Sequence, residues 1–418
     1  MGDGVEQRHD PYAALRHRDF QLYFAARIFL VLAGEATNVA VGWLLYERTH
    51  SAFALGLIGL VAGLPVILLA LPGGHVADTY DRRRVSAVTG ALIALSAAAL
   101  AAVSYWQAHV VFIYVILLIG GLVLAFNYPA RAALLPQIVP RDHFANAATW
   151  NSTAFLASAA LGPAFAGVVI AKTHSATAVF ATDAILSLMY GVLVGLIKGQ
   201  QPEPSGERMT LRSLAAGFDY VRKTEVILAA ITLDLFAVLL GGATTLLPIF
   251  AKDILHVGAD GLGWLRAAPS LGALLMAIAI AHLPPMRRAG RKLFLAVAGF
   301  GIATIVFGLS KSFPLSLAML FALGALDAVS MVIRSTLVQV RTPDEMRGRV
   351  SAVNGMFVDT SNELGGFESG AVAALVGPVA SVVAGGIGTL LSVVAIMRKW
   401  PALADLDTLQ SEDPEIPG

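Results

Sequence analysis

The stretch that decides the fold is Gly73-Gly74-His75-Val76-Ala77-Asp78-Thr79-Tyr80-Asp81-Arg82-Arg83-Arg84, here called the charged turn (residues 73–84). Residues 55–77 lead into it and residues 85–103 follow it, and neither run contains Asp, Glu, Lys or Arg. Each run is long enough to cross a bilayer as a helix, which takes about 20 apolar residues. Three consecutive arginines in a short loop favour the cytoplasmic side. The stretch therefore predicts a tight cytoplasmic turn between two membrane-spanning helices.

The composition of the whole chain agrees with a membrane protein. Of 418 residues, 57% are hydrophobic and only 14% are charged, and the mean hydropathy is +0.73. Soluble proteins are usually about a quarter charged, so this class is excluded. The chain has no cysteine, which excludes disulfides and thiolate metal sites. Residues 1–20 are polar and charged, and we expect no cleavable signal peptide there.

Hydropathy predicts twelve spanning helices. They fall near residues 20–46, 55–77, 85–104, 109–130, 145–171, 176–197, 226–250, 261–283, 293–310, 314–339, 350–375 and 379–397. With alternating loops, most basic residues gather on one side, and the other side carries only Arg48, Lys172, Lys252 and Lys311. This asymmetry predicts that both chain ends are cytoplasmic.

The longest break between spans divides them six and six. It contains Gln201-Pro202-Glu203-Pro204-Ser205-Gly206-Glu207, a composition typical of a linker. After it, residues 211–223 place Leu211, Leu214, Ala215 and Phe218 on one helical face, which predicts a helix on the membrane surface. The predicted organisation is a cytoplasmic segment 1–19, a six-helix bundle 20–197, a cytoplasmic linker 198–225, a second bundle 226–397 and a cytoplasmic tail 398–418.

An internal repeat indicates that the two bundles are duplicated. A shift of 203 residues superposes six identical pairs: Arg131 on Arg334, Leu134 on Leu337, Pro140 on Pro343, Asn151 on Asn354, Gly162 on Gly365 and Gly167 on Gly370. The same shift puts Arg84 on Arg287, so residues 287–292 are the counterpart of the charged turn, without an equivalent of Asp78. Duplicated bundles are how transporters build one cavity with two alternative openings. The predicted fold class is therefore an all-α membrane protein with twelve transmembrane helices in two duplicated six-helix bundles.

The charged turn resembles the loop between helices 2 and 3 of the major facilitator superfamily. The match falls on Gly74, Asp78, Arg83 and Arg84, while Thr79 and Asp81 depart from the superfamily pattern. The resemblance implies a cytoplasmic gate, in which Asp78 and Arg82, Arg83 and Arg84 latch the two bundles near the start of helix 11. The alternative is an ordinary basic anchor at the membrane edge.

Charged residues within the spans are candidates for the transport site, because a charge in the membrane is costly unless it meets water or a partner. Helix 1 carries Arg27, Glu35 and Asn38, and Glu35 lies near mid-span. Glu35 is the first candidate for a proton-carrying group, and pairing with a neighbouring helix is the structural alternative. Asp234 and Glu363 are further cavity candidates.

The other acidic residues of the spans are read as more structural. Asp183 is expected to cap or bridge, Asp327 to compensate Arg334 two turns away, and Asp359 to be structural. For Glu368, beside the glycines of helix 11, cavity lining and helix packing are both open.

In helix 5, Gly162-Pro163-Ala164-Phe165-Ala166-Gly167 predicts a bend and close helix contact. It resembles the Gly-Pro element of superfamily exporters. The superfamily's arginine in the middle of helix 4 finds no equivalent, because Arg131 is expected at the cytoplasmic end, beyond the span 109–130.

Two further segments, 127–136 and 341–350, look like the loops after helices 4 and 10 in the branch of the superfamily that includes the enterobactin (siderophore) exporter and related drug-efflux permeases. This resemblance implies proton-driven efflux of siderophores, drugs or other amphipathic small molecules, by antiport, across the bacterial cytoplasmic (inner) membrane. The alternatives are an importer or a lysophospholipid or lipid flippase of the same fold, and a membrane-embedded enzyme.

The expected partners are the lipid bilayer and a small-molecule substrate, with no nucleic acid, and we expect a monomer. No cofactor is expected beyond the proton gradient. The sequence has no phosphate-binding Gly-x-x-x-x-Gly-Lys-Ser/Thr loop, and its nine histidines are scattered, so we predict neither ATP-driven transport, nor a metal site, nor enzymatic catalysis.

Overall fold

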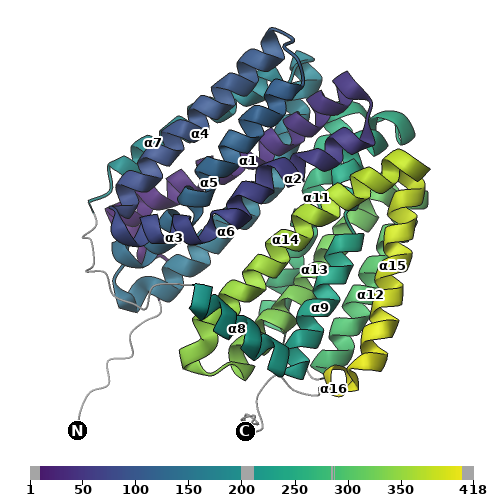
Figure 1. Ribbon diagram of the computed structural model, residues 1–418. Coiled ribbons are helices and arrows are strands. Elements are labelled where there is room, and N and C mark those ends of the chain that lie inside the picture. Colours follow the sequence, from purple (N-terminus) through teal and green to yellow (C-terminus); the bar gives the residue numbers. More distant parts are fainter. Residues whose placement is uncertain (1–9, 199–210, 284–285, 287, 407–418) are drawn as a thin grey trace.

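The computed structural model describes residues 10–198, 211–283, 286 and 288–406, and these residues form helices joined by short turns, with no strand among them. The predicted segments 1–19, 198–225 and 398–418 are therefore described only in part, and Arg287 lies outside the described residues. Figure 1 shows two groups of helices that incline toward each other at one end.

The first group precedes the undescribed stretch 199–210. It consists of α1 (Arg18–Thr49), α2 (Ala52–Leu68), α3 (Ala70–Thr79), α4 (Arg82–Tyr105), α5 (Val111–Ile138), α6 (Phe144–Thr173) and α7 (Thr177–Gly195). We call it the N bundle.

The second group follows that stretch and is called the C bundle. It begins with α8 (Leu211–Lys223), which is followed by α9 (Glu225–Leu240), a 3-10 turn (Ala243–Leu246), α10 (Leu247–Ile249) and a π-helical turn (Phe250–Ile254). The remaining helices are α11 (Gly258–His282), α12 (Ala289–Leu309), α13 (Phe313–Arg341), α14 (Asp344–Val376), α15 (Pro378–Lys399) and α16 (Pro401–Ala404).

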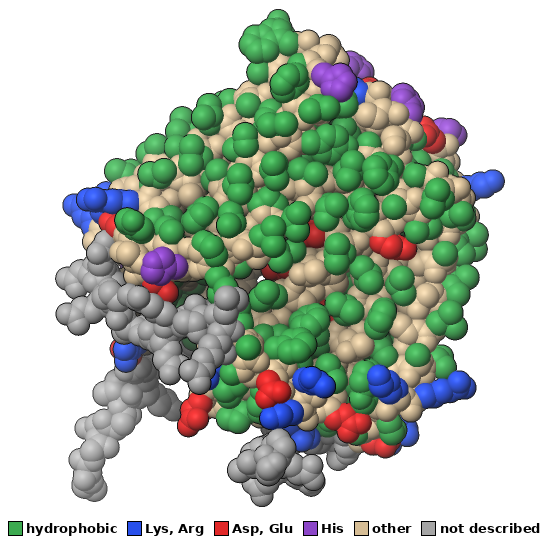
Figure 2. All heavy atoms as spheres, viewed as in Figure 1, with side chains coloured by type: hydrophobic (Ala, Val, Ile, Leu, Met, Phe, Trp, Pro, Cys, Tyr) green, Lys and Arg blue, Asp and Glu red, His purple; other side chains and the backbone are tan. Residues whose placement is uncertain are grey.

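The helices agree with the predicted spans in number and order. Within the described residues, ten helical stretches are long and apolar enough to cross a membrane, and the bent pair α2–α3 makes an eleventh. The twelfth predicted span is α14, which has 33 residues but is less apolar because it carries Asp359, Glu363 and Glu368. On the face shown in Figure 2, hydrophobic side chains cover the middle, and most charged side chains lie toward the two ends.

The predicted span 55–77 is broken rather than straight. Helices α2 and α3 meet at Leu69 with a bend of 50°. Pro72 explains the break, because it lacks a backbone N–H and its ring clashes with the carbonyl of the residue four positions earlier.

Helix α5 is longer than predicted. It includes Pro129 and Pro136 and ends at Ile138 instead of residue 130, so the segment 127–136 lies in a helix and not in a loop. Buried Asn127 fixes this part of α5, because its amide donates hydrogen bonds to Thr89 Oγ1 (2.8 Å) and Tyr190 Oη (3.0 Å). The second segment, 341–350, is also mostly helical, since α13 ends at Arg341 and α14 begins at Asp344.

In the described part of the chain, the hydrophobic core joins the bundles at one end only. One cluster combines Leu45 and Phe180 of the N bundle with Phe250, Leu262 and Phe307 of the C bundle. The remaining clusters each stay within a single bundle. We call the joined end, where α1 meets α2, the closed end. The other end, which carries the charged turn, α8 and α16, is called the basic end (Figure 1).

Two helix pairs make the most extensive contacts between the bundles, α2 with α14 and α6 with α11. Glycines allow their backbones to approach closely: a Cβ on Gly56 would lie 3.0 Å from Cα of Gly370, and one on Gly167 would lie 2.8 Å from Cα of Gly263. Helix α6 continues through Pro163 as one helix, and Gly162 packs against α1, where an added Cβ would lie 2.8 Å from Cβ of Glu35.

The predicted helix 211–223 is present as α8, and it packs on protein. Leu214 and Val221 contact the cluster formed by α9 and α14. The ring of Phe218 stacks on Phe357 at 6.3 Å, and Tyr220 donates a hydrogen bond to the carbonyl of Arg341 (2.7 Å). One face of α8 therefore fastens it to the C bundle.

Candidate transport cavity

A cavity of about 260 Å³ lies between the two bundles, on the basic-end side of the joined core. Five helices of the two bundles (α1, α2, α10, α11 and α14) and the turn 243–246 supply its walls. Its polar lining includes Asn38 of α1, Thr244 and Thr245 of the turn, Arg266 of α11, and Asn362 and Glu363 of α14. The cavity thus combines one arginine, one carboxylate and several neutral polar groups.

Glu35 lies half-buried beside this cavity and interacts with residues of both bundles. Its carboxyl is hydrogen-bonded to the Asn38 side chain and lies within electrostatic range of Arg266, which comes from the C bundle. Arg266 in turn donates a hydrogen bond to the carbonyl of Thr244 (2.8 Å). An acid of one bundle therefore faces a base of the other.

Arg266 was not among the residues predicted from the sequence. Its signal was a lone arginine inside the apolar helix 261–283, which is the kind of intramembrane charge that indicates a site. Its partners could not be read from the sequence, because Glu35 and Thr244 lie on other elements.

Glu363 occupies a slot in the contact between α2 and α14. A Cβ added at Gly59 would lie 2.6 Å from Oε2 of Glu363, and one added at Gly63 would collide with the same side chain. Asp359 lies one turn earlier on α14 and repels Glu363 electrostatically. The absence of side chains at the two glycines of α2 therefore leaves space for the Glu363 carboxyl at the contact between the two bundles.

Arg27 does not join Glu35. It lies instead with Arg131 of α5, whose charge acts on it, and its guanidinium carbon is 5.2 Å from the ring centroid of Phe155. Because α5 extends to Ile138, Arg131 lies within the helix and not beyond its end, while its place at the cytoplasmic side stays a prediction.

Asp234 is not on the cavity between the bundles, which corrects its prediction as a cavity residue. It is buried inside the C bundle and forms an ion pair with Arg334 of α13. The predicted compensation of Arg334 by Asp327 is wrong for the same reason. Sequence could not show this pairing, because the two residues are 100 positions apart in the chain.

Asp183 bridges two helices, as its structural reading predicted. The hydroxyls of Thr37 on α1 and Ser187 on α7 both donate hydrogen bonds of 2.6 Å to its carboxylate. No three His, Cys, Asp or Glu side chains converge on a metal-binding geometry anywhere in the described ranges.

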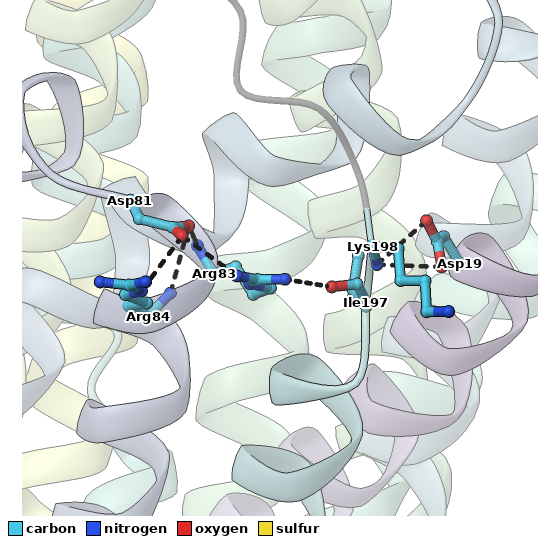
Figure 3. A network of polar contacts seen from close by, with 6 residues as sticks. All are labelled: Asp19, Asp81, Arg83, Arg84, Ile197 and Lys198. Carbon is cyan, nitrogen blue, oxygen red and sulfur yellow. Dashed lines mark hydrogen bonds and ion pairs between the residues drawn. The ribbon is translucent and has the colours of Figure 1, made fainter.

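The charged turn is held within the N bundle (Figure 3). Asp81 caps α4 by accepting hydrogen bonds from the backbone N–H groups of Arg83 (3.0 Å) and Arg84 (3.4 Å). Arg83 donates to the carbonyl of Ile197 at the end of α7 (2.7 Å), next to Lys198, whose backbone N–H bonds to Asp19 of α1. Asp81, one of the departures from the superfamily pattern, is thus the N-cap of α4.

The four charged residues assigned to the gate have partners within the N bundle. Arg82 pairs with Asp78 (3.5 Å) and donates to the carbonyls of Ala77 and Ala133. Among the described residues, none of the gate side chains contacts α14 through a hydrogen bond or ion pair. A Cβ at Gly74 would meet no heavy atom within 4 Å. The predicted latch is therefore not engaged in this conformation.

At the closed end, polar contacts join the bundles. Tyr46 of α1 donates a hydrogen bond to Asp253 in the π-helical turn. The neighbouring Lys252 lies 5.8 Å from the ring centroid of Trp43, also on α1. Neither contact could be predicted from the sequence, since a π-helical turn leaves no clear signal in composition. Such turns are frequent at functional sites.

Comparisons with known proteins agree with this architecture. The chain matches the family described as transmembrane secretion effector over residues 9–416. Relatives named enterobactin exporter EntS from Shigella boydii, Escherichia coli and Escherichia fergusonii are 25% identical over 403 residues, covering 96% of this chain and 95% of each relative.

Solved transporter structures share the fold at low sequence identity. A D-xylose–proton symporter matches with a TM-score of 0.68 and 15% identity, covering 92% of this chain and 97% of that one. A peptide transporter POT in complex with sulfate matches with a TM-score of 0.73 and 12% identity, covering 94% and 96%. The predicted fold class, two six-helix bundles of the major facilitator type, is confirmed.

Proposed function

The chain belongs to the transmembrane secretion effector family of the major facilitator superfamily, and from this premise we propose that it is a proton-coupled exporter of amphipathic small molecules. Its relatives named enterobactin exporter make siderophores the first class of cargo to test, with drugs as the second. The coupling is proposed as antiport, in which cargo and protons cross in opposite directions.

The observation that carries the proposal is the one-sided joining of the bundles. They share a hydrophobic core at the closed end and have separate cores at the basic end. Basic residues favour the cytoplasmic side, so the basic end and both termini are proposed to be cytoplasmic. The structure then corresponds to the state in which an exporter takes up cargo from the cell.

Alternating access follows from the helix pairs between the bundles. The α2–α14 and α6–α11 contacts would separate at the closed end while the basic end closes. The charged turn would then latch the bundles, with Asp78 and its arginines meeting the start of α14. The Tyr46–Asp253 hydrogen bond belongs only to the present state.

Glu35 and Glu363 are the proposed proton-carrying groups. Glu35 faces Arg266 across the two bundles, and Glu363 is held in the slot formed by Gly59 and Gly63. Rocking of the bundles changes both environments, so binding or losing a proton changes the free-energy difference between the two states. This is the linkage that antiport requires.

The proton gradient supplies enough free energy. One proton moving down 100 mV yields about 2.3 kcal/mol, and one pH unit adds about 1.4 kcal/mol. A one-to-one exchange would therefore support a cargo ratio of roughly several hundred across the membrane.

The test is accumulation of cargo in inside-out membrane vesicles under an imposed pH gradient, using a dye panel and a catecholate siderophore. The expected result is gradient-dependent uptake that is lost in Glu35→Gln or Glu363→Gln with the protein still folded. If uptake by the parent does not depend on the gradient, proton coupling is rejected. Gradient-driven movement of cargo out of the vesicles would support import.

A further inference from the structure

The N bundle contains two arginines that no carboxylate neutralises. Arg27 lies inside α1 and Arg131 inside α5, both away from the helix ends, and both are half-buried. Their charges act on each other. Within the described ranges, neither guanidinium forms an ion pair or donates a hydrogen bond, and Nε of Arg27 is fully buried without an acceptor. A buried charge without a partner is costly, so this pair requires an explanation.

The internal repeat provides the comparison. Arg131 corresponds to Arg334 in the C bundle by the shift of 203 residues. There the arginine is neutralised by Asp234 in a buried ion pair. In the N bundle the equivalent arginine has a second arginine as its neighbour instead of an acid. The same structural position is thus paired in one bundle and left positive in the other.

Each arginine of the pair lies over an aromatic ring. The guanidinium carbon of Arg27 is 5.2 Å from the ring centroid of Phe155, and that of Arg131 is 5.3 Å from the ring centroid of Tyr128. The two rings are 41% and 42% exposed, so their edges and faces remain accessible. The site therefore offers two cations and two aromatic surfaces together.

The site lies within electrostatic range of acids from both bundles. Tyr128 lies within electrostatic range of Glu35 on α1 and of Asp359 and Glu363 on α14. Among the described residues, however, the groups within electrostatic range of Arg27 are Arg131 and three neutral tyrosines, and no carboxylate is one of them. The N bundle thus carries a positive aromatic patch outside the lining of the 260 Å³ cavity, and Tyr128 links this patch electrostatically to the acids beside the cavity.

We propose that Arg27 and Arg131 bind the anionic group of the cargo, and that Phe155 and Tyr128 hold its planar ring. This inference rests on the proposed export function and names its cargo class: aromatic or conjugated carboxylates, phenolates and sulfonates. Guanidinium groups donate strong paired hydrogen bonds to such oxyanions and stack on flat rings. Glu35 and Glu363 stay free for protons.

Binding without any gradient tests this assignment. The probes are carboxyfluorescein, an aromatic anion, and rhodamine 123, a cation with the same ring system. Fluorescence anisotropy is recorded with the full-length protein in phosphatidylcholine nanodiscs. We expect the parent to bind carboxyfluorescein more tightly than rhodamine 123, with affinity falling as salt rises. Equal binding of the two dyes, or preference for the cation, would overturn the proposal.

Variants locate the site. Arg27→Gln and Arg131→Gln are each expected to weaken carboxyfluorescein binding about tenfold or more, as the loss of a charged hydrogen-bond donor does. Arg18→Gln, an exposed arginine earlier on α1, is the matched control and should bind like the parent. Unchanged anion binding in both arginine variants would overturn the assignment. The dye preference of the parent is decisive even where a variant fails to fold.

The two proposals fail separately. Anion-selective binding that depends on Arg27 and Arg131, in a protein that moves no cargo with the proton gradient, would support the site and reject proton-coupled export. Gradient-driven export of cationic dyes with no binding of anions would reject the site and keep the exporter.

Discussion

The hydroxyl of Tyr46 on α1 donates a hydrogen bond to the carboxylate of Asp253 in the π-helical turn, and this bond joins the two bundles at the closed end. It lies beside the shared hydrophobic core and next to the contact of Lys252 with Trp43. Because any opening at this end must break it, the bond contributes to the preference for the present state.

The first prediction follows from this bond. Tyr46→Phe removes the hydroxyl, and water takes its place at the exposed Asp253, so the closed state loses only the net contribution of one hydrogen bond to a charged group, about 1.5 kcal/mol. The chain has no cysteine, so Asn38→Cys provides a single reporter in the cavity. In Tyr46→Phe we expect about tenfold faster labelling of that cysteine by a membrane-impermeant maleimide applied from the closed-end side.

Tyr105→Phe is the matched control, because Tyr105 is 73% exposed at the same end and its ring contacts only Trp106 among the described residues. Equal labelling rates in the parent and in Tyr46→Phe would mean that the bond does not hold the closed end.

The second prediction concerns the slot for Glu363. Gly59→Ala places a methyl group 2.6 Å from Oε2 of Glu363, so the carboxyl must leave the slot. We expect gradient-driven transport to fall several-fold while the protein still folds. Gly120→Ala, where the added carbon meets no heavy atom within 4 Å, is the control and should keep full transport. Parent-level transport by Gly59→Ala would remove the slot from the mechanism.

The third prediction separates structure from function in the C bundle. Asp234→Asn leaves Arg334 as an unpaired buried charge, and we expect a loss of about 3–5 kcal/mol in the free energy of unfolding. Replacing both residues, as Asp234→Asn with Arg334→Met, should recover much of that loss because no buried charge remains. Denaturant unfolding in detergent measures both effects. A single variant as stable as the parent would contradict the buried ion pair.

The fourth prediction distinguishes the two acids of the charged turn. Asp81 caps α4, so Asp81→Ala should lower the stability by about 1 kcal/mol. Asp78 has a 46% exposed side chain and one partner, Arg82, so Asp78→Asn should leave the thermal unfolding midpoint nearly unchanged. We nevertheless expect Asp78→Asn to abolish most transport, because its latch forms only when the basic end closes. Full transport in folded Asp78→Asn would reject the gate.

Local sequence was sufficient for the spans and the charged turn. A helix that crosses a membrane needs about 20 apolar residues, and runs of this length can be recognised directly in the sequence. The end of α5 was misjudged because Pro129 and Arg131 are typical of a helix end. Tertiary contacts keep this region helical, since buried Asn127 forms hydrogen bonds with residues of α4 and α7.

The site was only partly predictable. Glu35 and Glu363 stood out as charges in apolar helices, and the structure brings both toward one cavity. Their partners come from distant parts of the chain: Arg266 for Glu35, and Gly59 and Gly63 for Glu363. The pairing of Asp234 with Arg334 was missed for the same reason, because helix packing and not sequence spacing selects such partners.

The most direct test of proton-coupled export is to measure the lumen pH of proteoliposomes while cargo leaves them. The vesicles are loaded with a catecholate siderophore, diluted without any pH gradient, and held at zero membrane potential. Antiport predicts that protons enter as cargo leaves, so the lumen acidifies only when the parent protein is present and not in Glu35→Gln. Cargo exit without a pH change, or with alkalinisation of the lumen, would contradict the account.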